Sequence, residues 1–396
     1  MENERTQSKS VLTKKRVIHC LWIILGIAAS IRLIRAAQAD SMDFHVYWKA
    51  AQTWIGQGIS PYLYDASDRG FVFKYPPWIL PFFFPFGFLS FEASKVTWAL
   101  VGLFCIYFSI YQLIRQGMRP GVAFVSAALF WWIWLGHIYS GQFTLVLLAA
   151  AMWAVPTRSS PGKLAFLSII FTTKVFSVIS LLGRWRECFR LRPVVAGLAL
   201  LLFLHLIVFG VFVLHGQSYG MVELYRQWVQ AASSGGQELG AVVVRGQMNH
   251  GFTAGVLRAF HVDAHETSLD YKVALVLAAL FSAIWVRASK GLKPVEVWAG
   301  WLGVGLICHP LAWHHSFVLA YPLCALSLDR AVSTRSTWLK ALSVFGMVCI
   351  GILIPNVFGM TLVTPLEMIS IKSWGVCFSA LALVLATRSL SSQQPA

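Results

Sequence analysis

Long apolar runs restrict most strongly how this chain folds. Of its 396 residues, 57% are hydrophobic and only 12% are charged, which is about half the charged fraction of an ordinary soluble domain. Several runs approach the roughly 20 apolar residues that cross a hydrocarbon core about 30 Å thick. Examples are Leu21–Ile34, Val96–Ile114, Val194–Leu214 and Val273–Val286. The sequence therefore predicts an all-α, polytopic membrane protein.

The net charge of +16 is distributed in short basic clusters between the apolar runs, such as Lys14–Arg16, Arg184–Arg192 and Arg287–Lys293. This distribution is typical of the positive-inside rule. A nucleic-acid-binding protein would instead carry one contiguous basic face, so no nucleic acid is expected among the partners. The seven cysteines are scattered and lack the spacing of a disulfide framework or a zinc site.

If the basic clusters lie inside, the chain crosses the membrane about 12 times and both termini lie inside. Val17–Ala36 has no small-residue cleavage site, so we expect it to remain as a helix rather than act as a signal peptide. The whole chain then forms one integral membrane domain. Its parts are a first transmembrane helix at 17–37, a first outer loop at 38–95, transmembrane helices within 96–214, a second outer loop at 215–270, transmembrane helices within 271–387 and a cytoplasmic tail at 388–396.

Two apolar segments are interrupted. Residues 164–183 are flanked by basic residues on both sides, which predicts a hairpin of two short helices that turns at Thr172-Thr173-Lys174. Irregular backbone at membrane depth is tolerated where it lines a cavity; a single helix with a snorkelling Lys174 is the alternative. Residues 76–91 contain four prolines, which predict a helix at the membrane surface rather than a continuous span.

Asp43 stands just after the first apolar run. An ionisable group at the membrane is costly unless a function retains it. The same outer loop contains Lys74-Tyr75-Pro76-Pro77-Trp78, and the two features together indicate a site that faces the membrane interface. From position alone, a helix cap or a solvated loop acid is an equal alternative.

With this topology, further polar side chains fall on the outer face. They are Asp40, His45, His137, Gln142, Arg245, Gln247, Asn249, His250, His309, His314 and His315, with Lys174 below them. Such donors suit a phosphate or pyrophosphate, and a single carboxylate suits a general base. A hard cation needs several oxygen ligands, and the adjacent His314 and His315 do not share a helix face. The sequence therefore predicts neither a metal nor a cofactor.

Read in order, these segments resemble glycosyltransferase family 87, enzymes of the GT-C fold class that use polyprenol-phosphate sugars. The matching residues are Asp43-Phe44-His45-Val46-Tyr47 with Ala50-Ala51, Gly58 with Pro61-Tyr62, Phe73-Lys74-Tyr75-Pro76-Pro77, Gly141-Gln142, Lys174, Gly246-Gln247-Met248-Asn249 and Pro310-Leu311-Ala312-Trp313-His314-His315. Two positions depart from the family. Val175 follows Lys174 where a proline is frequent, and Gln247-Met248-Asn249 stands where Asn-Gln-Ser is usual.

The resemblance implies a GT-C bundle with a cavity that opens to the outer leaflet. It also implies inverting transfer of a sugar, usually mannose or arabinose, from a polyprenyl-phosphate donor to a lipid or glycan hydroxyl, and a hexose such as mannose is the first expectation. Asp43 would be the catalytic base. The donor and its phosphate would be bound by Lys174, Arg245, His314, His315, Lys74, Tyr75, Gln142 and Asn249. The expected location is a bacterial inner membrane, with the site on the periplasmic side among membrane lipids.

Two other classes of protein meet similar ligands. A transporter or flippase of a sugar or lipid-linked sugar usually has internal repeats and a binding site at the membrane midplane, and this sequence has no such repeat. A non-catalytic assembly subunit should tolerate the combined loss of Asp43, Lys174 and His314.

Overall fold

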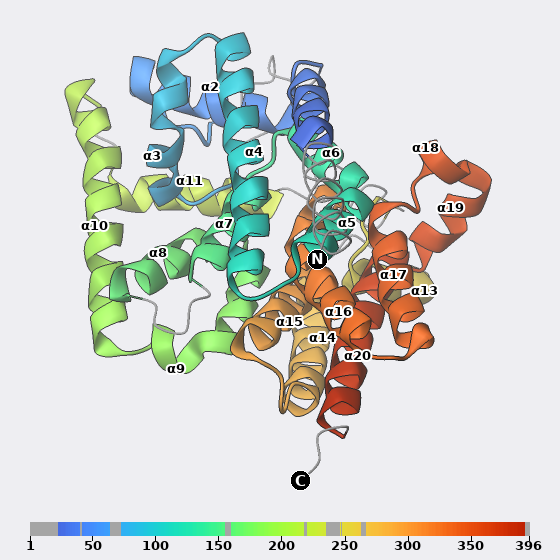
Figure 1. Cartoon of the computed structure of the whole chain (residues 1–396). Coiled ribbons are helices and arrows are strands. Elements are labelled where there is room, and N and C mark those ends of the chain that lie inside the picture. The colour runs from blue at the N-terminus through green and yellow to red at the C-terminus, as the bar shows by residue number, and fades with distance from the viewer. Residues whose placement is uncertain are drawn as a thin grey trace, which may run out of the picture.

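A computed structural model gives the fold of residues 23–39, 42–63, 73–154, 160–217, 220–234, 246, 248–262 and 267–392. Within these ranges all regular elements are helices, and the one strand-like pairing is an isolated bridge between Asn249 and Trp313. Figure 1 shows the helices gathered into a single bundle. The all-α prediction is confirmed.

Four helices of the described residues are long and apolar enough to cross a membrane. They are α4 (Phe91–Arg115), α10 (Leu191–Leu214), α14 (Thr267–Ala288) and α20 (Ile371–Ser391). A fifth candidate is the pair α5 (Pro120–Leu129) and α6 (Trp131–Ser140), which is bent by 60°. A multi-pass membrane protein is thus confirmed, but a count of about 12 crossings is not.

The remaining apolar helices are too short to count as crossings by length alone. They include α7 (Thr144–Ala154), α8 (Pro161–Phe171), α15 (Pro294–Ile307) and α17 (Thr337–Gly351), which have 11 to 15 residues. At 1.5 Å per residue they extend about 16 to 23 Å, less than the roughly 30 Å of the hydrocarbon core. By length alone, these helices therefore do not add to the four or five candidate spans of the described residues.

The segment at 38–95, which the sequence predicts to be outer, is more helical than expected. It begins with α2 (Met42–Gln57), and after the undescribed residues it continues with η1 (Pro77–Ile79), α3 (Leu80–Phe83) and η2 (Phe84–Phe88). Pro77, Pro81 and Pro85 each stand in the first turn of one of these short helices. Backbone N–H groups in a first turn make no hydrogen bond within the helix, so proline costs none there. The prolines interrupt this stretch as predicted, whereas α2 was not predicted.

The break at Thr172–Lys174 is confirmed. Helix α8 ends at Phe171, and a 3₁₀ helix, η3 (Val175–Arg184), follows the turn, leading into α9 (Trp185–Cys188). The hydroxyls of Thr172 and Thr173 donate to the carbonyls of Ile169 and Ile170 at 2.5 and 2.7 Å. Because these bonds occupy carbonyls at the end of α8, they help to close the helix before Lys174.

The segment at 215–270, which the sequence predicts to be outer, contains α11 (Met221–Ser234) and α13 (Phe252–Ala259). Figure 1 shows α11 lying crosswise to the upright α10. Leu224 is fully buried whereas Val222 and Arg226 are largely exposed. An amphipathic helix in this orientation suits a membrane surface. Beyond α15, the chain continues through η4 (His314–Ala320) and α16 (Tyr321–Ser333), and α18 (Pro355–Phe358) and α19 (Met360–Met368) precede α20.

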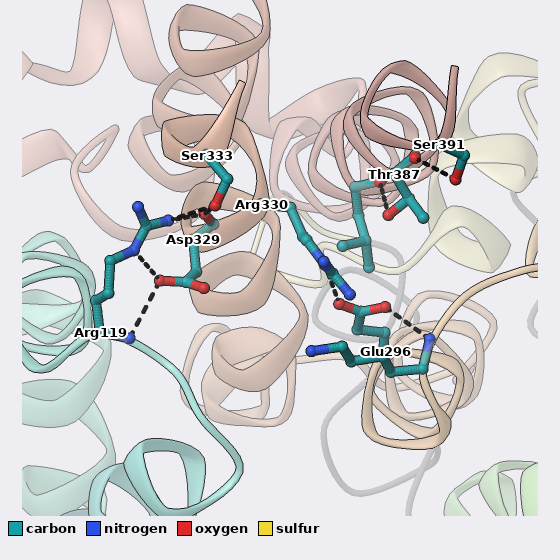
Figure 2. Close-up of polar contacts among 9 residues, drawn as sticks. Arg119, Glu296, Asp329, Arg330, Ser333, Thr387 and Ser391 are labelled. Atoms are coloured by element: carbon teal, nitrogen blue, oxygen red, sulfur yellow. Dashed lines mark hydrogen bonds and ion pairs between the residues drawn. The ribbon is translucent and has the colours of Figure 1, made fainter. Parts of the chain in front are cut away.

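Three basic clusters that the topology places inside lie together in the structure. Arg119 at the start of α5 pairs with Asp329 near the end of α16 at 2.8 Å. Arg330 pairs with Glu296 in the first turn of α15 at 2.5 Å (Figure 2). Since α5, α15 and α16 join at these ends, their basic clusters share one side of the bundle, as the positive-inside pattern requires.

This arrangement predicts the orientation of the chain. Single cysteines are introduced at Arg226 on α11 and at the exposed Lys290 between α14 and α15, with the native cysteines replaced. An impermeant maleimide should label Arg226→Cys in intact cells and Lys290→Cys only after lysis. The opposite labelling pattern would reverse the topology.

Candidate functional site

The N-terminus of α2 packs directly on the Gly141 turn. Phe44 is fully buried and stacks on Trp98 with 5.4 Å between ring centroids, and the Trp98 indole donates to the Gly141 carbonyl at 2.9 Å. Gly141 has φ +71°, and a Cβ built on it would lie 2.4 Å from the Phe44 Cβ. Glycine is needed here both for the left-handed backbone and for the close approach. This contact brings Gln142 beside Asp43.

Asp43 is partly buried in the first turn of α2, where the helix dipole favours an anion. Burial raises the pKa of Asp43 above its usual value, and a hydrogen bond with Gln142 and the positive charge of Lys174 partly offset that rise. Because a carboxylate with a raised pKa accepts a proton more readily while it is ionised, this setting suits a general base.

Two tyrosines lie next to this carboxylate. Tyr47 follows Asp43 by four residues and so shares its helix face. The Tyr47 and Tyr75 hydroxyls are 3.0 Å apart, and the Tyr47 hydroxyl donates to Gln142 Oε1 at 3.5 Å. The Tyr62 hydroxyl donates to the Tyr75 carbonyl at 2.8 Å. The motifs around residues 43, 75 and 142 therefore meet at one place.

Lys174 reaches this place from the break between α8 and η3. Its Nζ donates to Thr144 Oγ1 at 2.9 Å, and Thr144 begins α7 just after the Gly141 turn. The Trp78 indole donates to Thr172 Oγ1 at 3.1 Å, so the Tyr-Pro-Pro-Trp segment also contacts the turn that carries the lysine. Thr144 thus holds the Lys174 side chain, and the positive charge of Lys174 partly offsets the rise in the pKa of Asp43.

Three histidines lie within electrostatic range of Lys174: one in α6, one after the end of α15 and one in η4. The positive charge of Lys174 disfavours a second positive charge on His137, His309 and His315. His137 is buried in α6, and its Nε2 accepts the Leu145 amide at 3.0 Å, which places the proton of a neutral ring on Nδ1. The rings of His137 and His315 lie 6.3 Å apart and nearly perpendicular.

His314 points to a different neighbourhood. Its Nε2 lies 3.3 Å from the Trp132 carbonyl, its ring lies 6.3 Å from that of His250, and Lys372 is the lysine whose charge acts on it. The two adjacent histidines therefore have different ring neighbours: His315 packs near His137, and His314 packs near His250.

Asn249 supports the loop that carries these histidines. Its side chain is fully buried, Nδ2 donates to the Pro310 carbonyl at 2.6 Å, and Oδ1 accepts the Ala312 amide at 3.1 Å. Its Oδ1 also accepts the Gly251 amide at 3.2 Å. The side chain thus fastens residues 310–312 in place.

The other predicted residues are less closely joined to this cluster. Lys74 is partly buried, and its carbonyl accepts the Trp228 indole at 3.0 Å. Arg245, Asp40 and Gln247 lie outside the described residues. In the described part of the chain, no group of three or more His, Cys, Asp or Glu side chains is placed to hold a metal ion.

Sequence reasoning did not single out Tyr47 or Thr144 as site residues. Tyr47 lies one helical turn beyond Asp43, so recognition of a helix at 42–57 would have placed both on one face. Thr144 follows the Gly141-Gln142 motif by two residues. Its contact with Lys174 joins positions 30 residues apart, which no local pattern reveals.

The Gly141 contact can be tested by adding one methyl group. Gly141→Ala should destabilise the fold by about 1–3 kcal/mol because of the left-handed backbone and the clash with Phe44. The matched control is Gly162→Ala, since a Cβ on Gly162 meets nothing within 4 Å. Thermal unfolding in detergent checks this: Gly141→Ala should melt at a lower temperature, and equal melting of the two variants would contradict the account.

Comparison with known proteins shows what the chain is similar to. Residues 73–312 match the family model of glycosyltransferase family 87. Over 151 residues the chain is 28% identical to a polyprenol-phosphate-mannose-dependent alpha-(1-2)-phosphatidylinositol pentamannoside mannosyltransferase of Mycobacterium tuberculosis (strain CDC 1551 / Oshkosh). That alignment covers 35% of this chain and 35% of the relative, so the chain matches about a third of that protein's length. No solved structure matches the chain.

The matched range includes Tyr75, Gln142 and Lys174 from the cluster described above, while Asp43 and His315 lie on either side of it. Since the match extends over more than half of the 396 residues, the chain belongs to glycosyltransferase family 87.

Proposed function

We propose that this protein transfers a hexose, with mannose as the first candidate, from a polyprenyl-phosphate donor to a hydroxyl of a lipid or glycan acceptor. The observation that carries the proposal is that Gln142 hydrogen-bonds the Asp43 carboxylate at the start of α2, while the positive charge of Lys174, which Thr144 holds, acts on the same carboxylate. Family membership and the name of the mycobacterial relative support a polyprenol-phosphate sugar as the donor.

Asp43 is the proposed general base. The acceptor oxygen attacks the anomeric carbon as its proton passes to the Asp43 carboxylate, and the bond between that carbon and the phosphate oxygen breaks. Attack opposite to the leaving group inverts the anomeric configuration. Gln142, which hydrogen-bonds the carboxylate, orients it toward the acceptor.

The leaving group is polyprenyl phosphate, and its negative charge grows as the bond breaks. Lys174 is the proposed principal contact for that charge, because a preorganised cation stabilises charge that develops in the transition state. His315 is the proposed histidine partner of Lys174, because the positive charge of Lys174 acts on it. His314, Tyr75, Lys74 and Arg245 are further proposed donor-binding residues, and Asn249 is proposed to contribute through the loop that it holds.

The proposed location is a bacterial inner membrane, with the site open to the periplasmic leaflet. A lipid-linked donor and a lipid-anchored acceptor would both approach along the membrane, which agrees with the apolar surface of the bundle. The exposed apolar side chains of α10 and α14 would contact membrane lipids.

Replacement of Asp43 tests the base. Asp43→Asn preserves shape but cannot take up the proton, so transfer from polyprenyl-phosphate mannose should fall by about 10²- to 10⁴-fold. Donor binding and thermal stability should change little. Near-normal turnover in the purified variant would refute the general-base role, and donor binding without transfer by the unaltered protein would favour a flippase.

Two acids serve as controls for this substitution. Asp40→Asn changes the neighbouring acid, and Asp329→Asn removes the partner of Arg119 on the other side of the bundle. Both should retain most of the transfer rate per folded molecule. If Asp40→Asn loses as much as Asp43→Asn, the two acids act as a pair or the wrong one has been chosen.

Lys174→Met should weaken donor binding by roughly 10- to 150-fold, the effect of losing one charged hydrogen bond. Lys163→Met is the matched control, because Lys163 lies at the opposite end of α8 with its Nζ 5.0 Å from the centre of the Trp153 ring. Titration with the lipid-linked sugar measures both affinities. Equal affinities would make Lys174 a structural residue.

A further inference from the structure

A polar network joins residues 246–258 to the last two helices, and the proposed mechanism does not use it. At its centre is Arg258, near the C-terminus of α13. Its guanidinium donates to the carbonyls of Met368 (2.9 Å), Gly246 (2.9 Å), Asn249 (3.0 Å) and Glu367 (3.2 Å) and to Ser370 Oγ (2.9 Å). One side chain thus ties together two stretches more than 100 residues apart.

Two buried serines reinforce this junction. The Ser370 hydroxyl donates to the Gly251 carbonyl at 3.0 Å, and the Ser373 hydroxyl donates to the His250 carbonyl at 2.6 Å. Ser370 has φ +60°, a conformation that non-glycine residues keep only where their surroundings enforce it. The start of α20 therefore holds residues 249–251 from one side.

On their other side, residues 249–251 hold the loop that ends in His314 and His315. The Asn249 carboxamide bonds Pro310 and Ala312 as described above, and the His250 amide donates to the Ala312 carbonyl at 2.9 Å. The isolated bridge pairs Asn249 with Trp313, the residue that directly precedes His314. Each step in this path is a hydrogen bond between buried or partly buried groups.

We propose that Arg258 is a positioning residue that fixes residues 249–251 and, through Asn249, holds the loop that leads into His314 and His315. The planar guanidinium presents several donors in a fixed fork, which a lysine ammonium cannot reproduce. The last two helices carry no motif of the family resemblance, yet they would anchor the histidine loop through this residue. The inference rests on the proposed function for its kinetic consequence, but its structural part does not.

Hydrogen exchange of the purified protein tests the structural part. In Arg258→Lys, the backbone amides of residues 309–316 should exchange about 10-fold or more faster than in the wild type, because hydrogen bonds to a charged group are lost. The control is Arg226→Lys on α11, whose exposed side chain pairs only locally with Glu223 among the described contacts; it should leave these amides unchanged. Unchanged exchange in a folded Arg258→Lys protein would overturn the proposal.

Ser373→Ala provides a milder variant in case Arg258→Lys does not fold. It removes one hydroxyl bond to His250 and should accelerate exchange of the same amides by a smaller factor. Unchanged exchange in Ser373→Ala, with Arg258→Lys unfolded, would also overturn the proposal.

Kinetics test the link to the site. Arg258→Lys should raise the KM for the lipid-linked sugar about 10-fold, leave the acceptor KM unchanged, and have little further effect in a His315→Gln background. A merely structural role would lower kcat in both backgrounds with both KM values unchanged, and that result would refute the positioning role. Absence of transfer by the wild type would instead reject the proposed function, while the exchange result would still decide the structural part.

Discussion

The close packing of the first turn of α2 on the Gly141 turn is the contact on which the candidate site depends. Phe44 enters the core against Trp98, and Trp98 in turn fixes the Gly141 carbonyl. Asp43 is therefore carried to Gln142 by the apolar residue next to it. A methyl group at residue 141 has no room, so the contact requires a glycine. The packing of Phe44 on Trp98 thus fixes the position of Asp43 relative to Gln142.

The candidate site is built where helices end rather than along their length. Asp43 begins α2, Lys174 follows α8, and His315 lies at the start of η4. The ends of a helix have backbone N–H and C=O groups that make no hydrogen bond within the helix. In an apolar bundle these groups need other hydrogen-bond partners. Side chains such as Thr172 and Asn249 supply them. The same breaks that reduce the number of full-length spans thus provide the polar positions.

The sequence predicted the helical class and the longest spans because a 20-residue apolar run has few other solutions in a bilayer. It also predicted the break before Lys174, from the basic residues on both flanks. It missed α2, whose residues 42–57 mix polar and aromatic side chains without a long apolar run. It could not distinguish His314 from His315, because their ring neighbours His250 and His137 come from remote segments. The hydrogen bonds from Asn249 to residues 310–312 could not be predicted from the sequence either, because they join positions about 60 residues apart.

The central claim is that one lipid-phosphate sugar lies between Asp43 and Lys174. A cryo-EM map of the Asp43→Asn protein in a lipid nanodisc with polyprenyl-phosphate mannose tests it most directly. The account predicts the phosphate within hydrogen-bonding distance of Lys174 Nζ, with His315 nearby and the anomeric carbon turned toward residue 43. A phosphate bound elsewhere, for instance beside Arg258 and Lys372 with no density between residues 43 and 174, would contradict it.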